Sequence, residues 1–186
     1  MYATVHRNED YSSELSIVLD IVAKRPNNAR AHSNAGTLLF RQGLLEEAFP
    51  HFSDAVRLKP DYPEAHNNLG AILFSRGQLE EARGHLYEAL RLRKDFADAH
   101  ANFGAVLQQQ GQIADAVMHY SEAIRLKPTH ARAHSNLGLA FMAQGKVDEA
   151  ERQFETALKL DPNRRDTRRA LDELKRSANR SAPATR

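Results

Sequence analysis

The chain contains no cysteine and no tryptophan, and only 7% of its 186 residues are aromatic. Without cysteine it can form no disulfide, no thiolate nucleophile and no cysteine-ligated zinc site. It also lacks a run of about 20 apolar residues, which a membrane-spanning helix needs. The most apolar stretch, residues 16–23, is interrupted by Asp20. We therefore expect neither a disulfide scaffold nor insertion into a membrane.

The chain has little excess of either charge, since 26 basic and 24 acidic residues give a net charge of +2. The exception is residues 162–186, where eight basic and three acidic side chains give +5 and leave −3 for the rest. This basic end has no aromatic side chains to stack on bases, so we do not favour a nucleic-acid site there. A solvated terminal helix followed by a frayed tail explains it more simply.

The sequence repeats itself without gaps at a shift of 34 residues, in four blocks: 29–62, 63–96, 97–130 and 131–164. One set of glycines recurs inside an otherwise helical stretch: Gly36, Gly70, Gly104 and Gly138. Glycine is unfavourable within a helix, so we expect a partner helix to approach closely there. Alanines recur twelve residues later, at Ala48, Ala82, Ala116 and Ala150. We predict that these alanines face the glycines.

A second set of glycines predicts where the first helix of each block ends: Gly43, Gly77, Gly111 and Gly145. A left-handed glycine is the usual residue just beyond a helix. Acidic residues follow at once, for example Glu46 and Glu47, as the start of another helix favours. Apolar residues then recur at helical spacing until Pro60, Pro128 or Pro162, or Lys94 at the same phase of the second block. Each block is therefore predicted to form a hairpin of two antiparallel helices.

The recurring strings are AHSNAG, AHNNLG, AHANFG and AHSNLG at the block starts, A-x3-[FLY]-x2-A in the second helix, and LKP or LDP at the end. They resemble the tetratricopeptide repeat, from residue 26 to about 176. The resemblance implies an all-α fold, a right-handed α-solenoid of antiparallel helical hairpins. Around the repeats we expect a flexible N-terminus (1–10), a leading cap helix (11–25), a capping helix (165–176) and a disordered basic tail (177–186).

The first helices of such a solenoid line its concave side, and asparagine recurs there at one phase: Asn34, Asn68, Asn102 and Asn136. A primary amide can both donate to and accept from a peptide unit. The pattern resembles the asparagine ladder in the tetratricopeptide part of O-linked N-acetylglucosamine transferases, which holds substrate peptides by their main chain. The alternative is that asparagine is simply frequent at this phase.

We expect the neighbours of these amides to contribute to peptide binding. The candidates are Arg30, Ser33, Phe40, Asn67, Phe74 and Arg132, with Thr37, Arg41, Glu64, Asp98, Gln108, Ser135 and Met142 beside them. Repeats that capture the carboxylate tails of heat-shock chaperones use a specific set of Lys, Asn and Arg. This chain supplies only the ladder asparagine of that set, so we do not favour that ligand.

Histidine recurs at two phases: His32, His66, His100 and His134, and His51, His85 and His119. Side chains at one phase lie about a helix diameter apart and cannot share a metal ion. We interpret them as fillers of a wide slot and expect no metal and no cofactor. No phosphate-binding loop, nucleophile elbow or H-E-x-x-H string occurs either. We expect neither an enzyme nor a small-molecule substrate.

We therefore predict a scaffold that binds a peptide segment of a partner protein in its groove. Its first residues, Met1 to Ser16, lack the basic start and apolar run of a signal peptide, so we expect a cytoplasmic protein. A second hypothesis is the substrate-recognition module of a glycosyltransferase. The stretch HRNEDYSSELSIVLDIVAKRPNNARAH resembles the junction in bacterial O-mannosyltransferase-like proteins with such repeats. That resemblance implies an extracytoplasmic location. Self-association through a terminal helix is a third hypothesis.

Overall fold

The computed structural model describes residues 14–181, and within this range every regular element is an α-helix. The expected flexible residues 1–10, the first three residues of the cap helix and residues 182–186 lie outside it. The chain divides into two compact units, Met1–Lys94 and Asp95–Arg186. The predicted all-α fold of antiparallel hairpins is confirmed.

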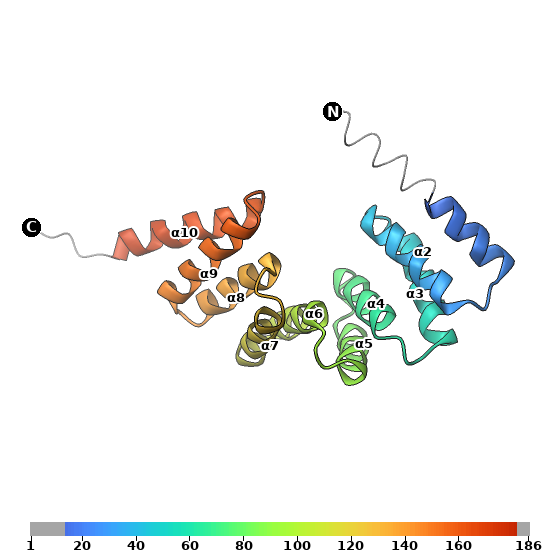
Figure 1. Cartoon of the computed structure of the whole chain (residues 1–186). Helices are drawn as coiled ribbons and strands as arrows, with labels where there is room; N and C mark the ends of the chain where they lie inside the picture. Colours follow the sequence, from blue (N-terminus) through green and yellow to red (C-terminus); the bar gives the residue numbers. More distant parts are fainter. Residues whose placement is uncertain (1–13, 182–186) are drawn as a thin grey trace, which may run out of the picture. The chain divides into compact units, whose positions relative to one another are not determined.

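The first unit contains a helix over residues 14–24 and two helical hairpins (Figure 1). The first hairpin pairs α2 (Ala29–Arg41) with α3 (Leu45–Leu58). The second pairs α4 (Pro63–Ser75) with α5 (Leu79–Leu92). Because α3 also packs against α4, the two hairpins stack on each other.

The second unit continues the pattern with two more hairpins and a final helix (Figure 1). The third hairpin pairs α6 (Ala97–Gln109) with α7 (Ile113–Leu126). The fourth pairs α8 (Ala131–Ala143) with α9 (Val147–Leu160), and α7 packs against α8. The last helix, α10 (Arg165–Ser181), packs on α9. It includes residues 177–181, so the prediction that the helix ends at residue 176 and a disordered tail follows is wrong for these residues.

The helix boundaries follow the 34-residue repeat. The first helix of each hairpin begins at residue 29, 63, 97 or 131, the first residue of each block. The turn glycines have the left-handed conformation that the sequence predicts, with φ of 80°, 75°, 78° and 72° at Gly43, Gly77, Gly111 and Gly145. At the first turn, the N–H of Gly43 donates to Phe40 and that of Leu44 to Leu39, both at 3.0 Å. This reverses the chain within three residues.

The core of each hairpin depends on one large side chain of its second helix. These side chains are Phe52, Leu86, Tyr120 and Phe154, each at most 1% exposed. Each is flanked by fully buried alanines, such as Ala48 and Ala55 around Phe52. In the second unit, Leu171 and Leu174 of α10 cover Phe154, so this helix closes the core of the fourth hairpin. No helix within residues 14–181 has the length and apolar character needed to cross a bilayer.

The side chain nearest to each mid-helix glycine is a large one rather than the predicted alanine, although the carbonyl oxygen of Ala82 would lie 3.2 Å from a Cβ atom at Gly70. A Cβ atom at Gly104 would lie 2.8 Å from Cε1 of Tyr120, and one at Gly138 would lie 2.6 Å from Cε1 of Phe154. In the first two hairpins the side chains at this place are Phe52, opposite Gly36, and Leu86, opposite Gly70. The glycine therefore makes room for the ring or leucine that fills the core, and the alanines bring the helices close beside it.

Substitution of Gly104 by alanine should destabilise the protein, because the added methyl group would overlap the buried Tyr120 ring. We expect Gly104→Ala to lower the free energy of unfolding by about 1–3 kcal/mol, the usual cost of overpacking a core. Gly84 is the matched control, since it lies within α5 and nothing would contact a Cβ there. Gly84→Ala should raise stability by about 0.5–1 kcal/mol. Urea unfolding measures both, and equal effects would contradict this packing account.

Candidate peptide-binding surface

The four ladder asparagines lie on the first helices of the hairpins, outside the core. Asn34 is exposed, while Asn68, Asn102 and Asn136 are half-buried. Each unit holds two of them, on α2 and α4 or on α6 and α8. We call the exposed part of α2 and α4 around them the first ladder surface, and that of α6 and α8 the second ladder surface.

In the first ladder surface the side-chain amide of Asn67 donates to Oδ1 of Asn68 at 3.1 Å. Asn67 is only 5% exposed and Ser33 only 4%, so these two candidates support the surface from below rather than offer themselves to a ligand. Arg30 is exposed beside Asn34 on α2. The remaining candidates of this unit, Phe40 and Phe74, are half-buried near the ends of their helices.

In the second ladder surface an arginine from one hairpin holds an asparagine of the other. Nη2 of Arg132, on α8, donates to Oδ1 of Asn102, on α6, at 2.7 Å. Arg132 is an exposed residue whose guanidinium lies partly among protein atoms. Burial and then Arg164 lower the pKa of Arg132, and Asp98 opposes this. The guanidinium remains a cation at neutral pH, so the amide of Asn102 is fixed beside a positive charge.

The second asparagine of this surface is held from the core side. The buried hydroxyl of Tyr120 donates to Oε1 of Gln108 at 2.9 Å, and the side chain of Asn136 lies close to the same hydroxyl. Burial raises the pKa of Tyr120, so the phenol stays protonated over the whole physiological range. Tyr120 therefore links the core of the third hairpin to the ladder of the fourth.

An acidic side chain completes the polar surroundings of the second ladder surface. Nε2 of His130 lies 3.0 Å from Oδ1 of Asp98, which follows the start of α6. The contact with His130 lowers the pKa of Asp98, and partial burial of the carboxyl opposes this. Further along α8, the hydroxyls of Ser135 and Thr167 are 2.7 Å apart and buried, so Ser135 supports α8 rather than facing a ligand.

Two polar contacts between neighbouring hairpins join residues that are 30 positions apart in the sequence. Arg132 and Asn102 are 30 residues apart, as are Arg76 and Glu46, whose side chains meet at 2.6 Å. A spacing of 30 is one repeat less one helical turn, which brings the residues into register on adjacent helices. Searching for charged or amide pairs at this spacing would have found both contacts.

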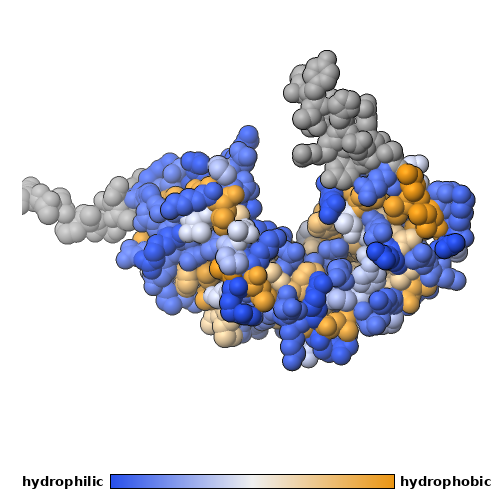
Figure 2. Space-filling model, viewed as in Figure 1, coloured by the Kyte–Doolittle hydropathy of each residue, from blue (hydrophilic) through white to orange (hydrophobic). Residues whose placement is uncertain are grey.

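The ladder surfaces carry polar groups, and no metal-ligating cluster occurs among the described residues. On the face seen in Figure 2, hydrophilic residues predominate and hydrophobic ones form separate patches. Between residues 14 and 181, no group of three or more His, Asp or Glu side chains could hold a metal ion. The ladder surfaces can donate and accept hydrogen bonds and can attract a negative charge at Arg132.

Comparison with known proteins identifies the repeat. Residues 27–95 and 131–164 match tetratricopeptide repeat models, and residues 106–145 match a TPR repeat model. No curated protein matches the chain significantly.

Solved structures show the same fold. The crystal structure of MamA is 27% identical, with a TM-score of 0.69, over 84% of this chain and 92% of that one. YrrB, "a TPR protein with an unusual peptide-binding site", is 20% identical, with a TM-score of 0.66, over 90% and 87%. A thermophilic TPR protein of Thermus thermophilus is 22% identical, with a TM-score of 0.71, over 92% and 94%.

The contact between His130 and Asp98 can be tested by replacing the histidine with phenylalanine, the residue that stands 34 positions earlier at Phe96. His130→Phe keeps a ring but removes the nitrogen that lies 3.0 Å from the carboxylate, so the pKa of Asp98 should rise toward its ordinary value. A carboxyl whose folded pKa is lowered stabilises the protein above its unfolded pKa and loses that effect as pH falls through the folded value. The variant should therefore lose stability at neutral pH and show a weaker acid dependence.

Carboxyl chemical shifts followed by NMR across an acid titration measure this pKa directly. Glu88 is the internal control, because a hydrogen bond from Arg91 lowers its pKa and His130 takes no part in it. An unchanged pKa of Asp98 in the variant would show that the histidine does not set it.

Proposed function

Because the chain is a tetratricopeptide repeat protein, we propose that it binds an extended peptide segment of a partner protein along its ladder surfaces. The observation that carries the proposal is the recurrence of one amide per hairpin on the first helices, outside the core in all four cases. These amides are suited to peptide groups, because each offers two donors and an acceptor to the peptide main chain.

The spacing of the helices suits an extended peptide. Packed helices lie about 8–10 Å apart, and an extended chain rises roughly 3.3 Å per residue. One asparagine therefore meets about every third residue of the ligand. Contacts to the main chain are insensitive to the side chains between them, so the ladder reads backbone conformation more than sequence.

The second ladder surface is more pre-organised for peptide binding than the first, because neighbouring side chains already orient its two asparagines. Arg132 fixes Asn102 and Tyr120 contacts Asn136, so less side-chain freedom is lost when a peptide binds. The cation of Arg132 beside Asn102 favours an acidic residue or a carboxylate in the ligand there. Asn34, by contrast, is exposed, and we assign it a weaker contribution.

A peptide-binding role agrees with the likeness to YrrB, whose structure is described as having a peptide-binding site. Since the likeness is 20% in sequence, it supports the fold and leaves the ligand to be argued from the surface. We propose binding without catalysis, because the polar groups described here act as donors, acceptors and charges that fix one another. No observation on the described residues favours the second hypothesis, a glycosyltransferase module.

The ladder can be tested with a peptide selected from a random phage-displayed library on the wild-type chain. Each hydrogen bond contributes about 0.5–1.5 kcal/mol net. The double variant Asn102→Ala, Asn136→Ala should therefore weaken binding by about 1–3 kcal/mol, roughly 5- to 150-fold. Calorimetric titration measures the dissociation constants.

A matched control changes two side chains on the second helices, Tyr87→Ala and Met118→Ala, which are 61% and 62% exposed. This variant should bind the peptide as the wild type does. Equal affinities for the ladder variant and the wild type, with both folded by circular dichroism, would reject the ladder as the binding element.

A further inference from the structure

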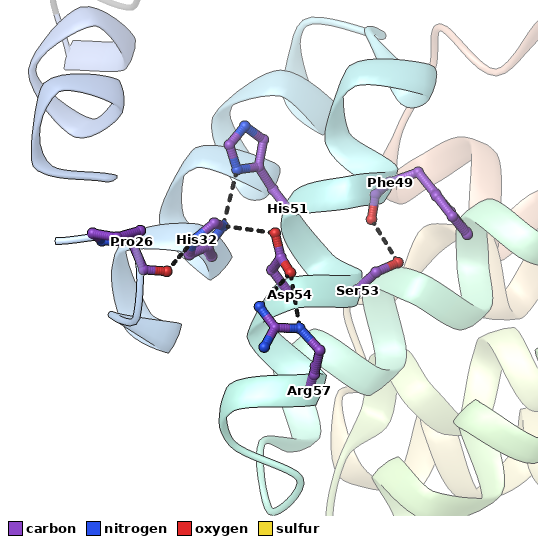
Figure 3. A network of polar contacts seen from close by, with 7 residues as sticks. All are labelled: Pro26, His32, Phe49, His51, Ser53, Asp54 and Arg57. Carbon is purple, nitrogen blue, oxygen red and sulfur yellow. Dashed lines mark hydrogen bonds and ion pairs between the residues drawn. The ribbon is translucent and has the colours of Figure 1, made fainter. Parts of the chain in front are cut away.

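The two histidine phases meet in pairs across each of the first three hairpins. His32 of α2 and His51 of α3 have their Nδ1 atoms 3.3 Å apart (Figure 3). His66 and His85 face each other in the same way at 3.0 Å, as do His100 and His119. The ring centroids are 5.2–5.4 Å apart in all three histidine pairs.

A backbone carbonyl orients the first histidine of the pair. Nε2 of His32 lies 3.0 Å from the carbonyl oxygen of Pro26, and Nε2 of His66 lies 2.9 Å from that of Pro60. A carbonyl oxygen can only accept, so Nε2 carries hydrogen in both. Nδ1 is then the atom whose protonation changes, and it is the atom that faces the second histidine.

This geometry limits the number of protons that one histidine pair can hold. A neutral pair places one N–H between the two Nδ1 atoms, and a singly protonated pair can do the same. A doubly protonated pair would place two N–H groups head to head at 3.0–3.3 Å between two cations. In the unfolded chain both histidines are free to bind a proton, so unfolding allows one more proton per pair.

Carboxylates near each histidine pair favour its protonated form, but arginines bind several of these carboxylates. In the first pair, Oδ2 of Asp54 lies 3.7 Å from Nδ1 of His32, while Arg57 binds Oδ1 of the same carboxylate at 2.8 Å (Figure 3). Near the second pair are Glu81 and Glu88, and Arg91 binds Glu88. Near the third pair are Asp115 and Glu122, and Arg125 binds Glu122. The ring of Phe103 also packs against His119. Burial, and then the first histidine, lower the pKa of His51, His85 and His119, against the carboxylates.

The fourth hairpin has a different partner at this place. Nε2 of His134 lies 3.0 Å from the carbonyl oxygen of Pro128, as in the first two pairs, but its Nδ1 lies 2.7 Å from Oε1 of Gln153. An amide can present either its oxygen or its NH2 group, so it satisfies the histidine in both protonation states. The fourth hairpin is therefore an internal control, in which glutamine replaces the second histidine of the pair.

We propose that the three histidine pairs form a pH-dependent contact that holds the first three hairpins closed at neutral pH and loosens them in acid, while the fourth hairpin is not affected. The sign follows from the proton count. Below the ordinary histidine pKa the unfolded chain binds more protons than the folded chain, so the free energy of unfolding decreases as the pH is lowered. The contribution is complete above that value and is lost as pH falls through the lowered folded values. Each pair changes the ratio of folded to unfolded chain by up to about tenfold per pH unit.

Urea unfolding between pH 8 and pH 5 tests the proposal with two opposite variants. The triple variant His51→Gln, His85→Gln, His119→Gln gives each of the first three hairpins the glutamine of the fourth, and its stability should depend less on pH than that of the wild type. Gln153→His creates a fourth pair and should make the dependence steeper. Equal pH dependence in all three proteins would overturn the proposal.

Hydrogen exchange of the intact wild-type chain gives a second readout if the triple variant does not fold. After correction for the intrinsic effect of pH, amides of α4 and α5 should open up to about tenfold more often at pH 5.5 than at pH 7. Amides of α8 and α9 should change much less. An equal change in the second and fourth hairpins would contradict the proposal.

Discussion

The structure depends on one contact in each hairpin, where a glycine of the first helix receives a large side chain of the second. The contact is too close for any Cβ atom, with distances of 2.6–2.9 Å to the facing carbon atoms. It fixes both the distance between the two helices and the rotation of the first helix about its axis. The rotation of the first helix in turn determines which of its other repeated side chains face the second helix and which face solvent.

The two polar features of the molecule follow from that rotation. His32 precedes Gly36 by four residues, about one helical turn, so it lies on the same side and faces α3. Asn34 precedes Gly36 by two residues and points to another side, where it is exposed. One helix therefore carries a histidine turned toward its partner and an amide turned toward solvent. Because both sit on the same rigid turn, whatever loosens the hairpin also displaces the ladder.

Much of this arrangement can be predicted from the sequence, because local chemistry decides it. The left-handed turn glycine Gly43 and the acidic start of α3 are examples, since each depends on a few neighbouring residues. The partner of Gly36 was predicted wrongly because periodicity shows that two positions recur together without showing which side of the second helix faces the glycine. Phe52, four residues after Ala48, is one turn further along that helix, and its ring lies over the glycine.

The contacts that join different helices were harder to predict, for the same reason. The two histidine phases are each visible in the sequence, but their meeting depends on how two helices lie against each other. Arg132 was predicted as a ligand contact, and only the packing of α8 on α6 shows that it also orients Asn102. Ser33 and Asn67 share the ladder helices, yet their burial follows from the rotation set by the glycine.

The central claim is that the ladder recognises the main chain of a peptide. It is tested most directly by comparing a bound peptide with versions N-methylated at single successive positions, with all side chains unchanged. The account predicts that affinity falls at positions about three residues apart, where an amide of the ladder meets the peptide group, and is nearly unchanged between them. Uniform tolerance of N-methylation, with affinity governed by side chains alone, would contradict it.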